Sequence, residues 1–280
     1  MNLDQERPVF LLGTGRCGST YVQKEFCLNT NIWLWGEHDG ILRGLKDWVE
    51  RVKNNRNIID FCFKHEEQPL ETIIKNADRN TDNDIAWLNR FRTDTLDAVL
   101  RHAILLLCAA NIPAGKTRWG FKEIRYGPDD RVAEALLAAF PKSSIIHLVR
   151  SPVATIESSM IAWRRQDIMD SLARNDASKI EEIYQEFATR WTRVTRYYLD
   201  LEIAYPLRVK TVRLEEFRES KVTLEEFLGI NFLKESFVEL EKINSAAHLA
   251  IGDLSATMAD CKGKCTVQLN DLAKRCGYQT

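Results

Sequence analysis

The sequence lacks a dominant charge and a long apolar run. Its 39 Lys and Arg residues are balanced by 40 Asp and Glu residues, leaving a formal net charge of −1. No broad basic surface therefore suggests binding to nucleic acid or a membrane surface. Hydrophobic residues make up 45% of the chain, but no run approaches the roughly 18 residues that span a bilayer. Residues 1–7 are too polar for a signal peptide. We expect a soluble, cytoplasmic protein.

The cysteines also give no sign of a disulfide framework. The count of seven is odd, and most cysteines stand alone in helix-like or loop-like sequence, which argues against a disulfide scaffold. Cys261 and Cys265 could bridge a small loop, but no second His or Cys pair completes a zinc site. We expect free thiols if the compartment is reducing.

What the sequence does contain is a glycine-rich loop near its start. Residues 8–12 are apolar and predict a buried strand, residues 13–18 include three glycines, and a helix is expected from Ser19 onward. Glycines allow the backbone to approach a ligand, and free N–H groups at a helix start attract anions. Phosphate binding is therefore predicted here. The candidate binding residues are Gly15, Arg16, Cys17, Gly18, Ser19 and Thr20.

Three motifs compete for this loop. Its glycines fit the Gly-x-Gly-x-x-Gly dinucleotide fingerprint and the first half of the P-loop. A P-loop requires a Lys after its last glycine to reach the terminal phosphates of ATP, and Ser19 takes that place. ATP hydrolysis is therefore not expected. Residues 16–20 resemble instead the 5′-phosphosulfate loop of sulfotransferases, which has a basic residue inside the loop and a Gly-Ser/Thr-Thr exit.

Strand-like and helix-like segments alternate along most of the chain. This pattern predicts an α/β protein with three α/β/α layers around a central parallel sheet, with ligands at the carboxyl ends of the strands. We expect one domain over residues 1–280. Within it, residues 41–115 are predicted to be a helical insertion that acts as an acceptor lid, and residues 250–280 a C-terminal loop and closing helix.

A second anion site is predicted where a strand ends in Arg150. Pro152 starts the next helix, and Ser158 follows Arg150 by eight residues. The guanidinium offers a planar fork to a phosphate, and the helix start adds amide donors. This combination is similar to the 3′-phosphate motif of sulfotransferases. It follows the first loop at the distance usual in that family.

Two further segments lie between these motifs. Residues 36–39 resemble the Gly-Glu segment that carries the catalytic base in tyrosyl-protein and several carbohydrate sulfotransferases. Residues 120–125 resemble a Lys-Glu/Asp-Pro-Arg segment of the same enzymes, with Ile124 in place of proline, and residues 272–278 resemble the closing helix of bacterial members. The resemblance to sulfotransferases implies a P-loop-NTPase-like fold and covers most of the chain.

The resemblance implies that the donor is 3′-phosphoadenosine 5′-phosphosulfate, that the product is 3′,5′-adenosine bisphosphate and that no metal is needed. The first loop would bind the 5′-phosphosulfate, and Arg150 with Ser158 would bind the 3′-phosphate. Lys262 and Lys264 would close over that phosphate. Lys122 would stabilise the leaving oxygen.

The same resemblance assigns the general base, and the tryptophans of the chain suggest an acceptor pocket. Glu37 is the expected base, with His38 as its rival because an imidazole titrates near neutrality. Trp33, Trp35 and Trp163 are candidates for an acceptor pocket suited to a cationic or ring-containing molecule, although tryptophans in such runs commonly pack in the core.

The acceptor stays open at this point. A hydroxyl or amine of a small molecule or natural product is expected, and a carbohydrate or tyrosyl acceptor is the alternative within the family. An oxidoreductase using a nicotinamide or flavin is the main rival, because Glu37 lies about twenty residues after the glycines, where an acid would hold the ribose. A non-enzymatic adenine-nucleotide-binding module is a further alternative.

Overall fold

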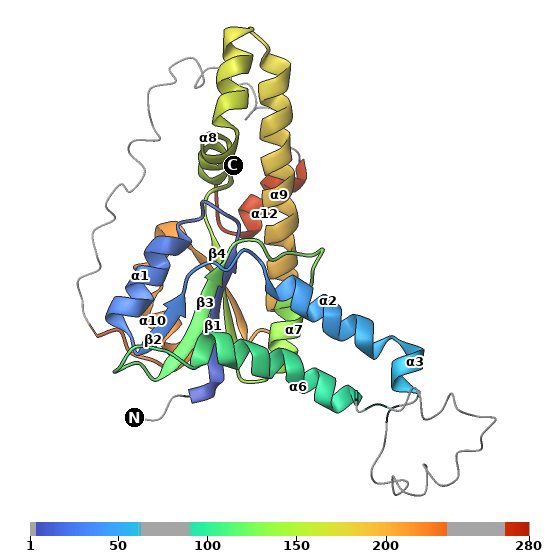
Figure 1. Ribbon diagram of the computed structural model, residues 1–280. Coiled ribbons are helices and arrows are strands. Elements are labelled where there is room, and N and C mark those ends of the chain that lie inside the picture. The colour runs from blue at the N-terminus through green and yellow to red at the C-terminus, as the bar shows by residue number, and fades with distance from the viewer. Residues whose placement is uncertain (1–3, 61, 63–88, 90, 234–266, 280) are drawn as a thin grey trace, which may run out of the picture.

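The computed structural model describes residues 4–60, 62, 89, 91–233 and 267–279. Five parallel strands form one sheet in the order β2-β3-β1-β4-β5, with helices on both faces (Figure 1). The strands are β1 (Asp4–Gly13), β2 (Ile32–Trp35), β3 (Arg118–Glu123), β4 (Ser144–Val149) and β5 (Val209–Arg213). The predicted three-layer α/β/α fold is confirmed.

The two faces of the sheet are set by alternation along β1. Phe10 and Leu12 point to one face and Val9 and Leu11 to the other, and all four are at most 1% exposed. Successive strand residues point to opposite faces, so one apolar strand serves two cores. The first face is covered by α2 (Leu42–Lys53), α6 (Thr93–Ile104), α7 (Val132–Ala139) and part of α9 (Ala177–Ala204). The second face is covered by α1 (Ser19–Asn29) and α10 (Lys221–Leu228).

A third apolar cluster lies between α8 (Pro152–Ala173), α9 and α12 (Val267–Arg275). The helices α8 and α9 run side by side and project beyond the sheet (Figure 1). Within α8 the backbone leaves helical geometry at Arg164, which marks a kink directly after Trp163. The shorter elements are α3 (Arg56–Ile59), the π-helix η1 (Leu105–Ala109) and the 3₁₀-helix η2 (Leu214–Glu216).

The starts of α7 and α8 are fixed by contacts of the residues just before them. Asp129 and Asp130 lie just before α7, which begins at Val132, and Arg131 between them and the helix adopts a left-handed φ of 50°. Asp130 still accepts a hydrogen bond from the Val132 N–H, at 3.1 Å. Ser151 does not cap α8 through its side chain. Its N–H instead donates to Glu215 at 2.9 Å.

The described part of the predicted insertion is helical and contributes to the core. Leu42 and Val49 of α2 and Leu96 and Leu100 of α6 are at most 8% exposed and belong to the first apolar cluster. These faces of α2 and α6 pack in the core. That the insertion acts as an acceptor lid stays a prediction. The cysteines that the structure describes are free, whereas Cys261, Cys265, Lys262 and Lys264 lie outside the described residues. None of the described helices has the length and apolarity to cross a membrane.

Candidate active site

The register of the sheet brings the predicted segments to one edge. β1 lies in the middle, with Leu11 beside Lys122 of β3 and Gly13 beside Leu148 of β4. On the outer side of β3, Trp35 of β2 pairs with Phe121. Because all strands are parallel, the loop after β1 is flanked by the ends of β3 and β4, and the exit of β2 lies next to Lys122.

The loop after β1 contains two residues with left-handed backbone geometry. Gly18 has a φ of 83° and directly precedes α1, and Arg16 has a φ of 66°, which is uncommon for a residue with a side chain. Gly15 must lack a side chain, because a Cβ there would lie 2.3 Å from the ring of Trp163. The first amides of α1 therefore border an open backbone turn covered on one side by a tryptophan.

The two predicted anion motifs meet at this loop. The Arg16 guanidinium donates through Nε to the Ser158 hydroxyl at 3.0 Å, although the residues are 142 positions apart. Arg150 donates from Nη1 to the main-chain carbonyl of Arg16 at 3.3 Å. Two guanidinium groups and a hydroxyl thus converge beside the start of α1, which is the composition expected of a site for a doubly phosphorylated ligand.

The other loop candidates differ in what their side chains contact. Cys17 is completely buried, and burial raises the pKa of its thiol to about 11 despite hydrogen bonding with Ser19. The thiol therefore packs in the core and stays protonated, and only the main chain of Cys17 can contact a ligand. Ser19 is 8% exposed. Thr20 is exposed, and its hydroxyl accepts a hydrogen bond from Lys122 at 3.4 Å.

Glu37 and Lys122 form an ion pair at this edge. The distance from Lys122 Nζ to the Glu37 carboxylate is 2.5 Å, and the lysine side chain is only 6% exposed. Arg125 contacts the second carboxylate oxygen at 2.8 Å. Burial favours a higher pKa for Glu37, but the hydrogen bonds from Lys122 and Arg125 outweigh it and hold this pKa below its usual value. Glu37 is therefore ionised.

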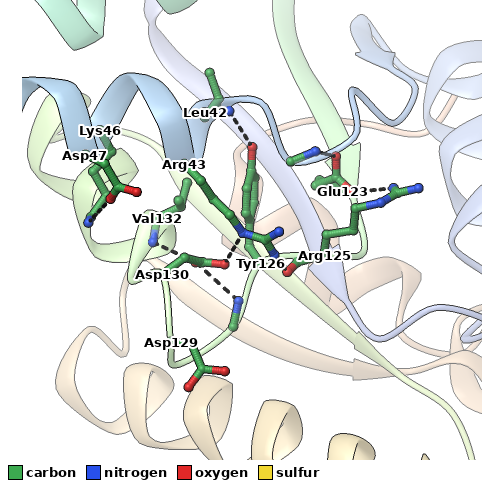
Figure 2. A network of polar contacts seen from close by, with 12 residues as sticks. Leu42, Arg43, Lys46, Asp47, Glu123, Arg125, Tyr126, Asp129, Asp130 and Val132 are labelled. Carbon is green, nitrogen blue, oxygen red and sulfur yellow. Dashed lines mark hydrogen bonds and ion pairs between the residues drawn. The ribbon is translucent and has the colours of Figure 1, made fainter.

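A buried carboxylate holds the loop that carries Glu37. The Glu123 side chain is 0% exposed and accepts hydrogen bonds from the main-chain N–H groups of His38 at 3.1 Å and Gly40 at 2.9 Å. It also accepts from the N–H of Ile124 at 2.8 Å. Arg125 donates to it at 2.9 Å (Figure 2). Glu123 thus ties the exit of β2 to the exit of β3.

His38 lies in a less polar position than Glu37. Its Nε2 is 2.6 Å from the hydroxyl of Tyr126, and its ring contacts Phe121 edge to face at 4.7 Å. Burial lowers the pKa of His38 and the Glu123 charge only partly opposes this shift. The imidazole is therefore neutral at neutral pH. Tyr126 also accepts a hydrogen bond from the N–H of Leu42 at 3.3 Å, which joins the start of α2 to the same network (Figure 2).

A small pocket, partly open to solvent, lies between the loop after β1 and the helices α8 and α9. Trp163 lines it, whereas Trp33 and Trp35 contact each other edge to face at 5.6 Å. Trp35 also donates to the Cys108 carbonyl of η1 at 2.6 Å and packs against the first apolar cluster. The three candidate tryptophans therefore do not share one pocket.

Residues 8–223 match the model of the sulfotransferase family. The chain belongs to this family. Solved structures similar to this sulfotransferase include the sulfotransferase domain of the Synechococcus PCC 7002 olefin synthase, with 17% identity, a TM-score of 0.52, and coverage of 100% of this chain and 98% of that one. A sulfotransferase from Alicyclobacillus acidocaldarius is 16% identical with a TM-score of 0.44, and the match covers 98% and 97% of the two chains. No curated protein matched the chain.

Some residues of this sulfotransferase were not assigned from sequence. Arg125 stood in the segment compared with Lys-Glu/Asp-Pro-Arg, and its position there was a signal that it could face Glu37. Glu123 stood beside it, but its role depends on burial that a polar strand end does not reveal. Arg190 of α9 lines the pocket, and no local motif marks it. The sequence of a long amphipathic helix does not reveal which of its polar residues face a pocket, because that depends on the elements packed against the helix.

Proposed function

We propose that this sulfotransferase uses 3′-phosphoadenosine 5′-phosphosulfate as its donor and transfers the sulfuryl group to a hydroxyl or amine of a small molecule. The observation that carries the proposal is the contact between Arg16 and Ser158, which unites the loop after β1 with the Arg150 site. A donor that carries a 5′-phosphosulfate and a 3′-phosphate requires two groups of anion-binding side chains on one surface.

The chain's own residues divide the work as follows. The N-terminal amides of α1 and Arg16 bind the 5′-phosphosulfate, and Arg150 with Ser158 binds the 3′-phosphate. Lys122, nearly buried beside Thr20, faces the oxygen that gains charge as the sulfur–oxygen bond breaks. Transfer in line with that bond needs positioning and electrostatic stabilisation, and no metal is invoked. Lys262 and Lys264 stay candidates for the 3′-phosphate.

Glu37 is the proposed general base, and His38 the rival. Both lie on the loop after β2, but only Glu37 contacts Lys122. An anionic donor beside Lys122 would compete with Glu37 for the ammonium group, which would raise the pKa of the carboxyl toward its ordinary value and make it a better proton acceptor. Donor binding and base activation would therefore be coupled.

A nicotinamide or flavin enzyme is the less favoured function. That reading requires Glu37 to hold a ribose, whereas both of its oxygens are engaged by Lys122 and Arg125. It also gives no role to the pairing of Arg16 with Ser158. Carbohydrate and tyrosyl acceptors, and the cytoplasmic location, stay open predictions.

Calorimetric titration tests the donor. We expect 3′,5′-adenosine bisphosphate to bind with micromolar or tighter affinity and Arg150→Ala to weaken it by tenfold or more, since a charge-assisted contact to phosphate contributes about 1.5–3 kcal/mol. Arg193→Gln, which removes a surface arginine paired with Asp129 at 2.5 Å, is the control and leaves binding unchanged. Tight NAD binding without bisphosphate binding would reject the proposal.

A further inference from the structure

The pocket beside the loop after β1 is lined by aromatic side chains and by one charged residue, Arg190. Trp163 and Phe187 lie with ring centroids 5.7 Å apart, and both line the pocket together with Trp191. The loop contributes Thr14 and Gly15. The pocket therefore adjoins the backbone turn where the transferring end of the donor is proposed to bind, which is where an acceptor must lie.

The polar side chains that α8 and α9 contribute to the wall are mostly committed to the main chain. Ser159 donates to the Thr155 carbonyl at 2.7 Å, Thr155 donates to the Arg150 carbonyl at 3.4 Å, and the Trp191 indole donates to that same carbonyl at 3.3 Å. These groups have no further hydrogen to offer to a ligand. Selectivity in the pocket must come from another side chain.

Arg190 is that side chain. It is exposed, its guanidinium lies 5.5 Å from the centroid of the Trp163 ring, and among the described residues no carboxylate pairs with it. The nearest candidate, Glu186 one turn earlier on α9, contacts Arg164 at 2.9 Å instead. A stacked guanidinium without an ion-pair partner keeps its planar edge available for an anion.

The surroundings of Arg190 add to this positive potential. Desolvation, followed by the like charges of Arg125 and Arg43, lowers the pKa of the Arg190 guanidinium. Arg43 is itself paired with Asp130 at 2.7 Å, and Arg125 with Glu37. The Glu186 carboxylate opposes this shift only in part, so the pKa of Arg190 still falls below its ordinary value. An anion entering the pocket would relieve this repulsion, whereas a cation would add to it.

We propose that the acceptor of this sulfotransferase is a ring-containing compound that bears a carboxylate, with its ring against Trp163 and Phe187 and its carboxylate on Arg190. A carboxylate matches the two parallel N–H donors of one guanidinium edge. This inference rests on the proposed function for the position of the acceptor, and it replaces a cationic acceptor with an anionic one. Arg190 is then a specificity-determining residue that takes no part in the bond-breaking step.

The test uses three phenols that share a ring and a hydroxyl: para-hydroxyphenylacetate, tyramine and para-ethylphenol. Their binding to the full chain, saturated with 3′,5′-adenosine bisphosphate, is measured by ligand-observed NMR titration. We expect the acid to bind at least about tenfold more tightly than the amine and the neutral phenol, because only the acid gains a charge-assisted pair. Arg190→Gln should remove that preference, Arg190→Glu should reverse it toward tyramine, and Arg193→Gln should leave it intact.

The affinity for the bisphosphate separates the two proposals. We expect Arg190→Gln to bind the bisphosphate within about twofold of the unmodified chain. A loss of tenfold or more would make Arg190 a donor-binding residue and overturn the acceptor assignment. Equal binding of the three phenols, failure of all three to bind at millimolar concentration, or a preference for the acid that survives Arg190→Gln would also overturn it. Absence of bisphosphate binding in the unmodified chain would instead reject the donor.

Discussion

At the scale of single residues, the charge state of Glu37 is the main mechanistic feature. Lys122 and Arg125 hold its two carboxylate oxygens at 2.5 and 2.8 Å, which lowers its pKa and keeps it ionised. An ionised carboxylate can accept a proton, but the two cations weaken it as a base until one of them is drawn away. His38, which is neutral and contacts Tyr126, is the other candidate base on the same loop.

We predict that Glu37→Gln lowers turnover by about a hundredfold or more, the size of a general-base effect, and leaves bisphosphate affinity unchanged. Because the Glu37 pKa in the free enzyme lies below the ordinary 4.5, the carboxylate stays ionised as the pH falls. The acid side of the pH profile of kcat/KM should therefore be flat down to about pH 5. Steady-state kinetics with labelled donor would measure both quantities.

Asp39→Asn is the matched control for that experiment. Asp39 lies on the same loop, is 91% exposed and contacts Arg125 at 3.0 Å, but it does not contact Lys122. We expect it to change turnover by less than about threefold, as for a surface ion pair. If His38→Ala causes the large loss and removes an acid limb that lies below pH 6.5, His38 is the base and the assignment of Glu37 is wrong.

At the scale of elements, the strand exits are held together by a carboxylate rather than by a turn residue. Ile124 replaces the proline of the related segment, and its N–H donates to Glu123 at 2.8 Å, a hydrogen bond that proline cannot make. Having Ile124 in place of proline therefore adds one hydrogen bond to the buried Glu123 carboxylate. Glu123 fixes the loop after β2 through His38 and Gly40 and so indirectly positions Glu37.

We predict that Glu123→Gln lowers the free energy of unfolding by about 2–3 kcal/mol. The amide keeps the size of the side chain but places an NH₂ group against main-chain N–H donors, so buried donors lose their acceptor. Denaturant unfolding measures the loss. Glu182→Gln, which alters an exposed carboxylate of α9 paired with Lys179, should change stability by less than about 0.5 kcal/mol. Equal effects of the two substitutions would contradict a structural role for Glu123.

At the scale of the whole molecule, a buried neutral histidine on a strand of the sheet makes folding stability depend on pH. His147 of β4 is 1% exposed, stacks on Tyr198 at 4.7 Å between centroids, and lies 3.1 Å from the Thr211 hydroxyl. Burial lowers its pKa to about 3 from an ordinary 6.5. Between these two values the unfolded chain binds a proton at this residue and the folded chain does not, so folding stability falls as the pH falls.

We therefore predict a loss of about 2 kcal/mol in unfolding free energy between pH 7 and pH 5 from His147 alone. Urea unfolding at the two pH values measures it. His147→Asn should make the stability less dependent on pH in this range, because the amide does not titrate. His102→Gln, on the exposed side of α6, should keep the full dependence. A His147→Asn profile that parallels the unmodified chain would refute the prediction.

Much of the architecture was predictable because its signals are local. The apolar runs predict the strands of the parallel sheet, and Gly18 predicts the loop after β1 and the start of α1. The spacing from Arg150 to Ser158 is likewise a pattern of a few neighbouring residues. Helix limits follow less directly from the sequence. The helix α7 begins only at Val132, and no local pattern predicts the left-handed backbone at Arg131.

The amino-acid sequence alone determined the α/β class, the family resemblance and the chemical types of the site residues, because strand periodicity and glycine-rich turns depend on local backbone sterics. Only the tertiary structure decided which of those residues meet. The contact of Arg16 with Ser158, the ion pair of Glu37 with Lys122 and the place of Arg190 over Trp163 depend on strand register and helix packing. These are set by the burial of surfaces far apart in the chain, which no local pattern encodes.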